Sequence, residues 1–278
     1  MTEVSYGDSV GLVLVAAGSG TRLGGGVPKA LRELAGAPML VQALEPFAGL
    51  VQYECVVVPA DLCASVRAML GDSVAVVAGG ATRQESVDAG LQALSAAAGL
   101  VLVHDAARPL VPAAVVSAVL TALTAGADAV IPVLPVVDTI KEVDADGVVM
   151  ATPQRDRLRV VQTPQGFRRP VLVAAHAAGV GGAATDDAGL VERLGGRVQT
   201  VPGAVESFKI TGPADWERAE RLLTARTAAL RSVSEAERGS LPEAGCAPAP
   251  GAGHRSVPGA VHRSVPEAGH RSVPGATR

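Results

Sequence analysis

Short, almost continuously apolar runs rich in β-branched residues alternate with amphipathic segments through the first half of this chain. The apolar runs cover residues 10–18, 53–60, 73–80, 99–107 and 127–136, and the amphipathic segments cover 38–50, 61–70, 84–97 and 112–125. Strands of a parallel sheet have this character when helices cover both faces of the sheet. The order of the segments therefore predicts an α/β fold with a doubly wound, mostly parallel, Rossmann-like sheet and right-handed crossovers.

Residues 137–157 interrupt this alternation. They contain two short extended stretches around the turn sequence DADG at 144–147, in which glycine supplies a positive φ, and they predict a β-hairpin. A hairpin that protrudes from an α/β domain has little of its own chain to pack against. We therefore expect it to be a dimerisation arm that packs on a second copy of the chain.

The C-terminal part differs in composition from the rest. From Ser232 onward it is rich in Gly, Pro, Ser, Ala and Arg, and it ends in three near-copies of an eight-residue unit, each beginning with His-Arg-Ser-Val-Pro. These repeats are too short and too poor in large apolar groups to bury a core. The sequence thus predicts one folded domain over residues 1–231 and a disordered tail over 232–278, which is too short for a fused second enzyme.

The composition argues against several other classes of protein. The chain has 278 residues, of which 48% are apolar and 18% charged, and its formal net charge is −3. It is long enough to bury a large core, and its charge does not favour a nucleic-acid partner. No apolar run approaches the roughly 20 residues that span a bilayer, and the N-terminus does not resemble a secretory signal. We expect no membrane partner, a cytoplasmic location and reduced cysteines.

The glycine-rich segment 16–24 (AAGSGTRLG) lies at the carboxyl end of the first predicted strand, and Pro28 and Lys29 follow it. Ligands of doubly wound sheets bind outside the carboxyl ends of the strands. Small residues there let backbone N–H groups approach a phosphate chain, and an arginine and a lysine nearby can hold its charge. The segment matches neither the Walker pattern nor the dinucleotide-binding fingerprint, so it predicts a phosphate-binding loop of another kind.

Further motifs follow in a fixed order. They are 79–87 (GGATRQESV), 104–109 (HDAARP), 138–141 (DTIK), 162–167 (QTPQGF), 185–187 (TDD) and 208–211 (FKIT). With the glycine-rich segment they resemble the sugar nucleotidyltransferases, and their order and spacing resemble the 2-C-methyl-D-erythritol 4-phosphate cytidylyltransferase family over residues 10–228. The resemblance implies a homodimeric enzyme of the non-mevalonate isoprenoid pathway. It would use Mg²⁺ or another divalent cation to convert CTP and 2-C-methyl-D-erythritol 4-phosphate into 4-diphosphocytidyl-2-C-methyl-D-erythritol and pyrophosphate.

The resemblance also implies roles for individual residues. The cations on the triphosphate and the transition state would be Arg22, Lys29 and Lys209. The residues expected to bind the nucleotide are Ala16, Ala17, Gly18, Gly79, Gly80, Ala81, Arg83 and Ser86. The residues expected to bind the polyol phosphate are Asp105, Arg108, Thr163, Thr185 and Lys209 of one subunit, together with Thr139 and Arg155 from the hairpin of the other. Ala81 stands where close relatives often have a polar residue, so we expect main-chain groups to read the base there.

Two residues in these motifs have competing interpretations. Asp105 is the expected ligand of Mg²⁺, which prefers oxygen, although an aspartate beside an arginine is often only a structural ion pair. Arg155 has Arg157 and Arg159 close by, and a register slip would exchange their roles.

The reaction implied by the resemblance needs no general base, because the attacking phosphate oxygen is already anionic at pH 7. Positioning and electrostatics should dominate it, so we expect His104 to be a packed residue. Two alternatives stay open: a cytidylyltransferase for another polyol phosphate such as ribitol 5-phosphate, and a nucleotide-binding protein without turnover. The chain has only three lysines, Lys29, Lys141 and Lys209, and the resemblance gives no role to Lys141.

Overall fold

The structure of the chain is a computed structural model, and it describes residues 8–18, 27–178 and 185–239. The chain divides into two compact units, Met1–Val233 and Ser234–Arg278. The first unit carries the sheet and its helices. Of the second unit only 234–239 are described, as the end of the last helix, and the repeats predicted to be disordered lie outside the described residues.

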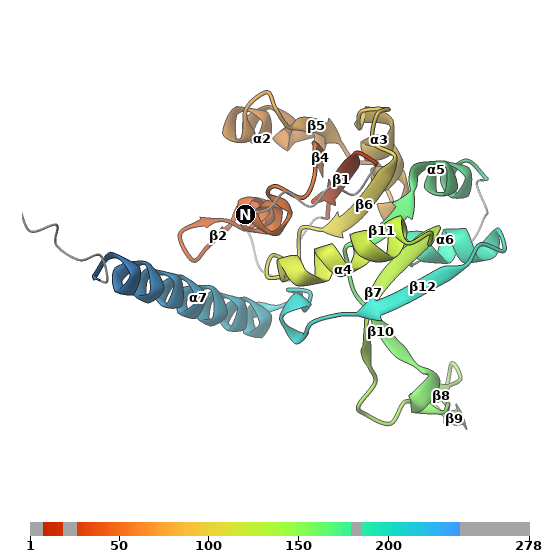
Figure 1. Cartoon of the computed structure of the whole chain (residues 1–278). Helices are drawn as coiled ribbons and strands as arrows, with labels where there is room; N and C mark the ends of the chain where they lie inside the picture. The colour runs from red at the N-terminus through yellow and green to blue at the C-terminus, as the bar shows by residue number, and fades with distance from the viewer. Residues whose placement is uncertain (1–7, 19–26, 179–184, 240–278) are drawn as a thin grey trace, which may run out of the picture. The chain divides into compact units, whose positions relative to one another are not determined.

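A mixed sheet forms the centre of the first unit (Figure 1). Its described strands are β1 (Val10–Val15), β4 (Tyr53–Val58), β5 (Ala75–Ala78), β6 (Leu100–Asp105), β7 (Ala129–Pro135), β10 (Arg159–Val161), β11 (Gln165–Arg168) and β12 (Val198–Pro202). They are ordered β10-β7-β11-β6-β1-β4-β5, with β12 paired to β7. The pairs β1–β4, β1–β6, β4–β5 and β12–β7 are parallel, whereas β10 and β11 run antiparallel to their neighbours. The five apolar runs are therefore strands, as predicted, and the sheet is mostly parallel.

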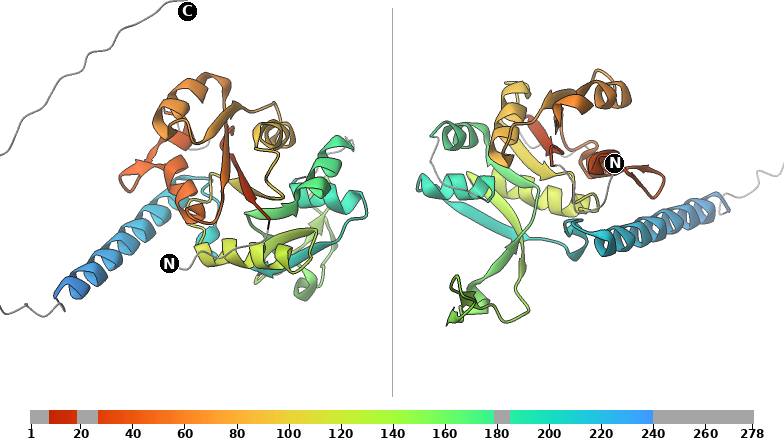
Figure 2. Two further views of the ribbon diagram at one scale, coloured as in Figure 1. Left: turned by 45° about the horizontal axis from the view of Figure 1, so that its top comes forward. Right: turned by 180° about the vertical axis from the view of Figure 1, so that it is seen from behind.

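Helices cover both faces of this sheet (Figure 2). They are α1 (Met39–Leu44), α2 (Cys63–Leu70), α3 (Arg83–Ala93), α4 (Ala113–Thr124), α5 (Arg169–Ala177) and α6 (Asp187–Arg193), with short 3₁₀ helices η2 (Lys29–Leu31), η3 (Glu45–Phe47), η4 (Ala60–Leu62), η5 (Arg155–Arg157) and η6 (Val205–Ser207). Apolar residues of α1, α2 and α4 pack in one core and those of α3, α5 and α6 in another.

Successive residues of the central strands alternate between these two cores. In β6, Leu100 and Leu102 belong to the first core, whereas Val101 and Val103 belong to the second. Side chains of a strand point alternately to opposite faces, so both faces of β6 must be apolar, and its residues are all buried. This burial on both faces explains the continuous apolar runs and confirms the doubly wound fold.

The predicted hairpin is present as β8 (Glu142–Val143) and β9 (Val149–Ala151). Gly147 has a φ of 83°, and the Asp144 carboxylate accepts the N–H groups of Asp146 and Val148 at 3.0 and 2.9 Å, which closes the turn. Every residue of both strands is exposed. The hairpin extends away from the sheet below β7 and β10 (Figure 1).

The last helix, α7 (Pro213–Gly239), corrects the predicted start of the tail. It continues through residues 232–239, which were expected to be disordered, because this stretch still contains the helix-favouring sequence SEAER before its glycine. Ala219 and Leu223 of α7 pack in a third apolar cluster with Leu34 and Met39. Leu34 belongs to a small hairpin of β2 (Glu33–Leu34) and β3 (Ala37–Pro38).

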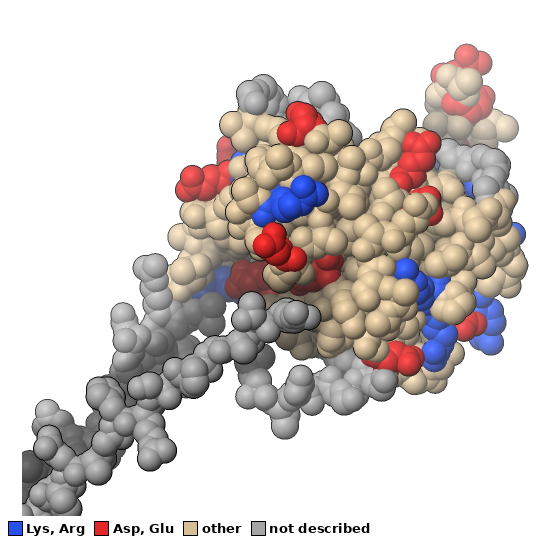
Figure 3. Space-filling model, turned by 90° about the horizontal axis from the view of Figure 1, so that it is seen from above, with Lys and Arg blue, Asp and Glu red and all other residues tan. Residues whose placement is uncertain are grey.

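Charged side chains are sparse on one face of the molecule, in keeping with the 18% of charged residues in the sequence. On the face shown in Figure 3, uncharged residues cover most of the area and charged residues form small, separate groups. Among the described helices, none combines the length and the hydropathy that a bilayer-spanning segment requires.

Candidate active site

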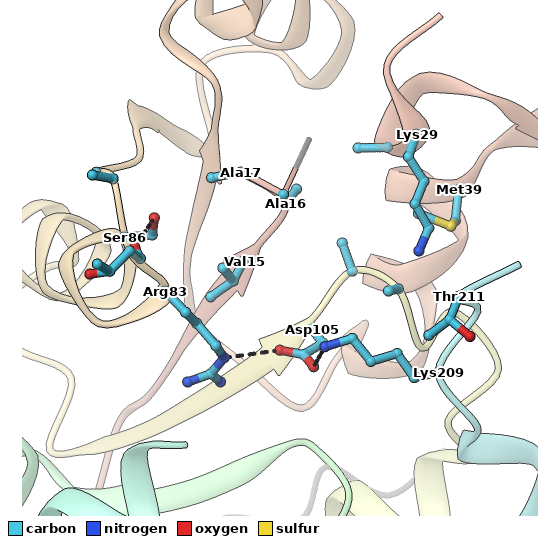
Figure 4. A pocket seen from close by; sticks show the side chains of 17 residues that line it. Val15, Ala16, Ala17, Lys29, Met39, Arg83, Ser86, Asp105, Lys209 and Thr211 are labelled. Atoms are coloured by element: carbon cyan, nitrogen blue, oxygen red, sulfur yellow. Dashed lines mark hydrogen bonds and ion pairs between the residues drawn. The ribbon is translucent and has the colours of Figure 1, made fainter. Parts of the chain in front are cut away.

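A cavity of about 490 Å³ opens at the carboxyl ends of β1, β5 and β6. Its lining comes from segments far apart in the sequence: Val15, Ala16, Ala17 and Gly18; Lys29, Ala30 and Met39; Gly80, Ala81, Thr82, Arg83 and Ser86; Asp105, Ala106 and Ala107; Lys209 and Thr211. Ten of these residues were predicted from the sequence as site residues. Figure 4 shows Lys29 on one side of the cavity and Arg83 on the other, with Asp105 between Arg83 and Lys209.

The ends of β1 and β5 meet closely in the cavity wall, which explains one glycine of the second motif. A Cβ atom on Gly79 would lie 2.5 Å from the Cβ of Ala17 and 2.8 Å from Oγ of Ser86. Both distances are too short, so only glycine lets the two chain segments approach in this way. Gly79 thereby shapes the cavity from behind, although it is not among the lining residues.

Helix α3 begins at the cavity with a capping box. The Thr82 hydroxyl accepts the Glu85 N–H at 3.1 Å, and the Glu85 carboxylate accepts the Thr82 N–H at 3.0 Å. This cap fixes the start of the helix, and therefore the positions of Arg83 and Ser86 in its first turn.

Asp105, at the end of β6, is surrounded by three cationic side chains. One carboxylate oxygen accepts from Nε of Arg83 at 3.3 Å and the other from Nζ of Lys209 at 2.9 Å. Nε of Arg108 lies 3.9 Å from the second oxygen. Burial would raise the pKa of Asp105, but Arg83, Lys209 and Arg108 outweigh it and lower the pKa to about 2. Asp105 is therefore ionised at neutral pH.

The residues behind Asp105 are held by backbone and side-chain hydrogen bonds. Arg108 donates from Nη1 to the carbonyl of Ser207 at 2.8 Å, and the Thr163 hydroxyl accepts the Asp105 N–H at 3.2 Å. Thr163 also bonds Nδ1 of His104 at 2.9 Å. Arg108 and Thr163 are not among the residues that line the cavity, so they border it from behind.

His104 is a packed residue, as predicted. Its side chain is buried, its two ring nitrogens bond Thr163 and the Arg108 carbonyl, and its ring lies 4.9 Å from that of Phe47. Burial lowers its pKa to about 4, so the ring is neutral at pH 7.

Lys29 approaches the cavity from η2 and donates from Nζ to the carbonyl of Ile210. The amide of Ile210 in turn donates to the carbonyl of Ala107 at 2.8 Å. The segment that carries Lys209 thus also holds Lys29, and both lysines line the same cavity.

The structure leaves other predicted residues outside the cavity. Arg22 lies outside the described residues. Thr139, Arg155 and Thr185 are exposed, and Arg155 donates to the carbonyl of Val137 at 2.9 Å within the hairpin. In this single chain, the hairpin residues do not meet the cavity.

Asp187 has no role implied by the sequence, although it lies in the TDD motif at 185–187. Asp187 accepts from Nη1 of Arg83 at 2.6 Å and is buried. The two adjacent aspartates of that motif looked alike in sequence. Asp186 accepts the N–H of Gly189 and caps α6, and only the fold shows that the next carboxylate turns toward Arg83.

The cavity offers one carboxylate to a divalent cation. Among the described residues, no group of three or more His, Cys, Asp or Glu side chains could hold a metal by itself. Mg²⁺ commonly binds one or two carboxylates together with substrate phosphates. The ionised, cavity-facing Asp105 fits that role only in the presence of a phosphate ligand, since Arg83 and Lys209 now occupy its oxygens.

A doubly wound sheet with a cation-lined cavity at the carboxyl ends of its strands is the arrangement with which α/β proteins bind phosphate-bearing ligands such as nucleotides. The family model described as "IspD: 2-C-methyl-D-erythritol 4-phosphate cytidylyltransferase" matches residues 10–225. The chain therefore belongs to the 2-C-methyl-D-erythritol 4-phosphate cytidylyltransferase family, as its motifs predicted, and it is a nucleotidyltransferase.

Individual relatives agree with this assignment. The chain is 56% identical over 216 residues to a 2-C-methyl-D-erythritol 4-phosphate cytidylyltransferase of Frankia casuarinae, covering 77% of this chain and 81% of the relative. It is 51% identical over 232 residues to the enzyme of that name from Nocardia farcinica, covering 82% of this chain and 100% of the relative. The crystal structure of 2-C-methyl-D-erythritol 4-phosphate cytidylyltransferase from Thermus thermophilus matches with a TM-score of 0.65 and 38% identity, over 77% of this chain and 98% of that one.

Proposed function

We propose that this protein transfers CMP from CTP to 2-C-methyl-D-erythritol 4-phosphate and releases pyrophosphate, in isoprenoid biosynthesis. The observation that carries the proposal is the charge of the cavity: its lining includes three cationic side chains, Lys29, Arg83 and Lys209, and one anionic side chain, Asp105. A surplus of positive charge in a partly enclosed site favours the binding of anionic phosphates. Family membership supplies the identity of the two substrates.

The chemistry follows from the two anions that must meet. An oxygen of the polyol phosphate attacks the α-phosphorus of CTP, and the bond from that phosphorus to pyrophosphate breaks. The attacking oxygen is anionic at pH 7, so no side chain needs to remove a proton. His104 agrees with this, because it is buried and both of its ring nitrogens are engaged with Thr163 and the Arg108 carbonyl. Lys29 and Lys209, together with Arg22, hold the phosphates in line and stabilise the charge that develops in the transition state.

The two substrates are proposed to bind next to each other at the cavity, with Lys209 beside the phosphates of both. Backbone groups of segment 16–18 and of 79–81 contact the nucleotide, and Arg83 and Ser86 flank it from the start of α3. Backbone atoms near Ala81 read the base, because the alanine side chain has no polar group. The residues proposed to hold the polyol phosphate are Asp105, Arg108, Thr163, Thr185 and Lys209, with Thr139 and Arg155 from the hairpin of a second copy.

Asp105 would also hold the divalent cation, Mg²⁺ or a similar ion. When bound, such a cation neutralises phosphate charge. Binding of its phosphate ligands would draw Lys209 away from Asp105, and the Lys209 side chain is 46% exposed and has a flexible stem.

The exposed hairpin supports a homodimer. Val149 and Met150 in the hairpin are 53% and 66% exposed, and Val137 at its base is 75% exposed. Apolar groups grouped on one projecting element favour burial against another surface. The variant Met150→Asp should shift the protein from dimer to monomer in analytical ultracentrifugation and should lower turnover, because Thr139 and Arg155 would no longer reach the second site. An unchanged dimer would contradict the proposed interface.

The function itself is tested by an assay of pyrophosphate release. The purified full chain with CTP and Mg²⁺ should release pyrophosphate rapidly with 2-C-methyl-D-erythritol 4-phosphate and slowly with ribitol 5-phosphate. A faster rate with ribitol 5-phosphate would overturn the substrate assignment, and no release with either would indicate a nucleotide-binding protein without turnover. We propose the cytoplasm as the location because CTP, a highly charged anion, does not cross membranes unaided.

A further inference from the structure

Five polar side chains, in which nitrogen-bearing and carboxylate groups alternate, form a continuous chain of contacts. It runs from α5 and α6 to the cavity. Nε2 of His176 on α5 lies 3.1 Å from the Asp187 carboxylate at the start of α6. The other oxygen of Asp187 accepts from Nη1 of Arg83 at 2.6 Å. Nε of Arg83 then meets Asp105, and Asp105 meets Lys209. Figure 4 shows the last two links, with the Arg83 side chain reaching from α3 toward β6.

The inner end of this chain is almost fully enclosed. The side chains of His176 and Asp187 are 2% and 1% exposed, whereas Arg83 is 27% exposed and lines the cavity. Breaking a buried ion pair by removing one partner is strongly unfavourable, because the remaining charge is left without compensation. The Asp187–Arg83 pair therefore fixes the guanidinium more firmly than an exposed pair would.

Arg83 depends on both carboxylates for its orientation. Asp187 holds Nη1 and Asp105 holds Nε, while the remaining nitrogen, Nη2, is buried without a hydrogen-bond partner among the described residues. Without Asp187, the guanidinium would keep only its contact through Nε and could rotate about it. The position of its positive charge relative to Asp105 and to a ligand in the cavity would then change.

We propose that Asp187 is a positioning residue of the active site, which holds Arg83 against Asp105 and thereby sets how Asp105 is shared between Arg83 and Lys209. His176 supports Asp187 from the opposite side. The inference rests on the proposed function, in which Arg83 flanks the nucleotide and Lys209 binds the phosphates. Asp187 would influence both Arg83 and, through Asp105, Lys209 without contacting either substrate.

The test compares two neighbouring carboxylates. Asp187→Asn removes the charge that Arg83 needs and keeps the shape of the side chain. We expect kcat/KM for CTP to fall on the order of 100-fold, as displacements of about 1 Å in reacting groups do, and direct CTP binding measured by calorimetry to weaken. Asp186→Asn is the matched control, because Asp186 caps α6 and accepts from Gln165 at 2.7 Å without meeting Arg83. The asparagine of this variant can still accept the N–H of Gly189 but its amide nitrogen cannot accept from Gln165, so the control should lower the melting temperature while kcat/KM stays within about twofold of the wild type.

A double-mutant cycle separates positioning from a structural role. If Asp187 acts through Arg83, adding Asp187→Asn to Arg83→Gln should change kcat/KM by less than about twofold. Equal losses in both backgrounds, or a lower melting temperature with unchanged kcat/KM, would overturn the proposal. If Asp187→Asn does not fold, His176→Phe is used in its place. This variant should lower kcat/KM at least about fivefold when Arg83 is present and should have no effect in the Arg83→Gln protein. An unchanged kcat/KM with Arg83 present would equally overturn the proposal.

The outcomes also separate this inference from the proposed function. A wild-type protein that turns over CTP and 2-C-methyl-D-erythritol 4-phosphate, with an Asp187→Asn variant of equal kcat/KM, would refute the positioning role alone. A wild-type protein without turnover would refute the function, and the CTP-binding comparison between Asp187→Asn and Asp186→Asn would still decide the positioning role.

Discussion

Asp105→Asn should make the stability of the folded protein less dependent on acid. The pKa of Asp105 is about 2 in the folded protein and 3.8 ordinarily, and one pKa unit corresponds to about 1.4 kcal/mol. The charged carboxylate therefore contributes about 2 kcal/mol to the free energy of unfolding at pH 7. Because the folded-state pKa is the lower one, this contribution is complete well above pH 3.8 and is lost as the pH falls toward 2; at pH 3 roughly half of it, about 1 kcal/mol, remains.

The measurement is urea unfolding of the wild type and Asp105→Asn at pH 7 and at pH 3, followed by the fluorescence of the single tryptophan, Trp216. Comparing the two proteins at each pH cancels the titration of all other groups to first order. The wild type should be more stable than the variant at pH 7, and the difference should shrink by about 1 kcal/mol at pH 3. A difference that stays constant or grows would show that Arg83, Lys209 and Arg108 do not stabilise the Asp105 carboxylate as their distances indicate.

Three further predictions concern the cations, the histidine and the tail. Lys29→Ala should lower kcat for pyrophosphate release by about 100-fold or more while circular dichroism shows a folded protein; unchanged kcat would remove Lys29 from the catalytic set. His104→Asn should lower the melting temperature but change kcat by less than about tenfold, because the attacking phosphate oxygen is already anionic and leaves no proton for the ring to take; loss of turnover in a folded variant would identify it as a base. Removal of residues 232–278 should leave kcat unchanged, since α7 packs on the sheet domain through Ala219 and Leu223, and a large drop would show that the tail supports the site or the dimer.

The parts of the fold that could be predicted are those in which local sequence and burial agree. β1 and β6 are buried on both faces, so every position is apolar or small until the functional residues begin. β11 and β12 were missed for different reasons. β11 contains Gln165 and Gly166 and is only four residues long, and β12 has exposed positions at Gln199 and Thr200. Their place in the sheet depends on pairing with distant strands, and a sequence pattern does not record that pairing.

For the candidate site, the sequence predicts which residues gather at the sheet edge but not how their side chains are oriented. From the rule that ligands bind at the carboxyl ends of strands, Gly18, Gly80 and Asp105 were expected to lie together, and all three line one cavity. Their roles in binding stay predictions. The rule does not say which way a side chain turns. Arg108 follows Asp105 by three residues, yet its Nη1 bonds the carbonyl of Ser207, which is 99 residues away in sequence. Such directions depend on the folded surroundings and not on the motif.

The three lysines lie in different surroundings, which the sequence alone does not reveal. Lys141 donates to the hydroxyl of Thr152 at 2.7 Å across the hairpin, which gives it a local structural contact. Lys29 and Lys209 are instead both linked to the segment 209–210. Lys29 donates to the carbonyl of Ile210, and the neighbouring Lys209 pairs with Asp105. That segment leads directly into α7, whose start is fixed because Asp215 accepts from Thr211 and Gly212.

The C-terminal helix therefore supports the proposed active site even though its own helical residues do not line the cavity. Its Ala219 and Leu223 pack against Leu34 and Met39, and Met39 itself lines the cavity. A shift of α7 would move Ile210 and Lys209, and with them the Ile210 carbonyl to which Lys29 donates. Because catalysis of phosphoryl transfer depends on the placement of such cations, mutations in this apolar cluster should affect turnover before they unfold the sheet.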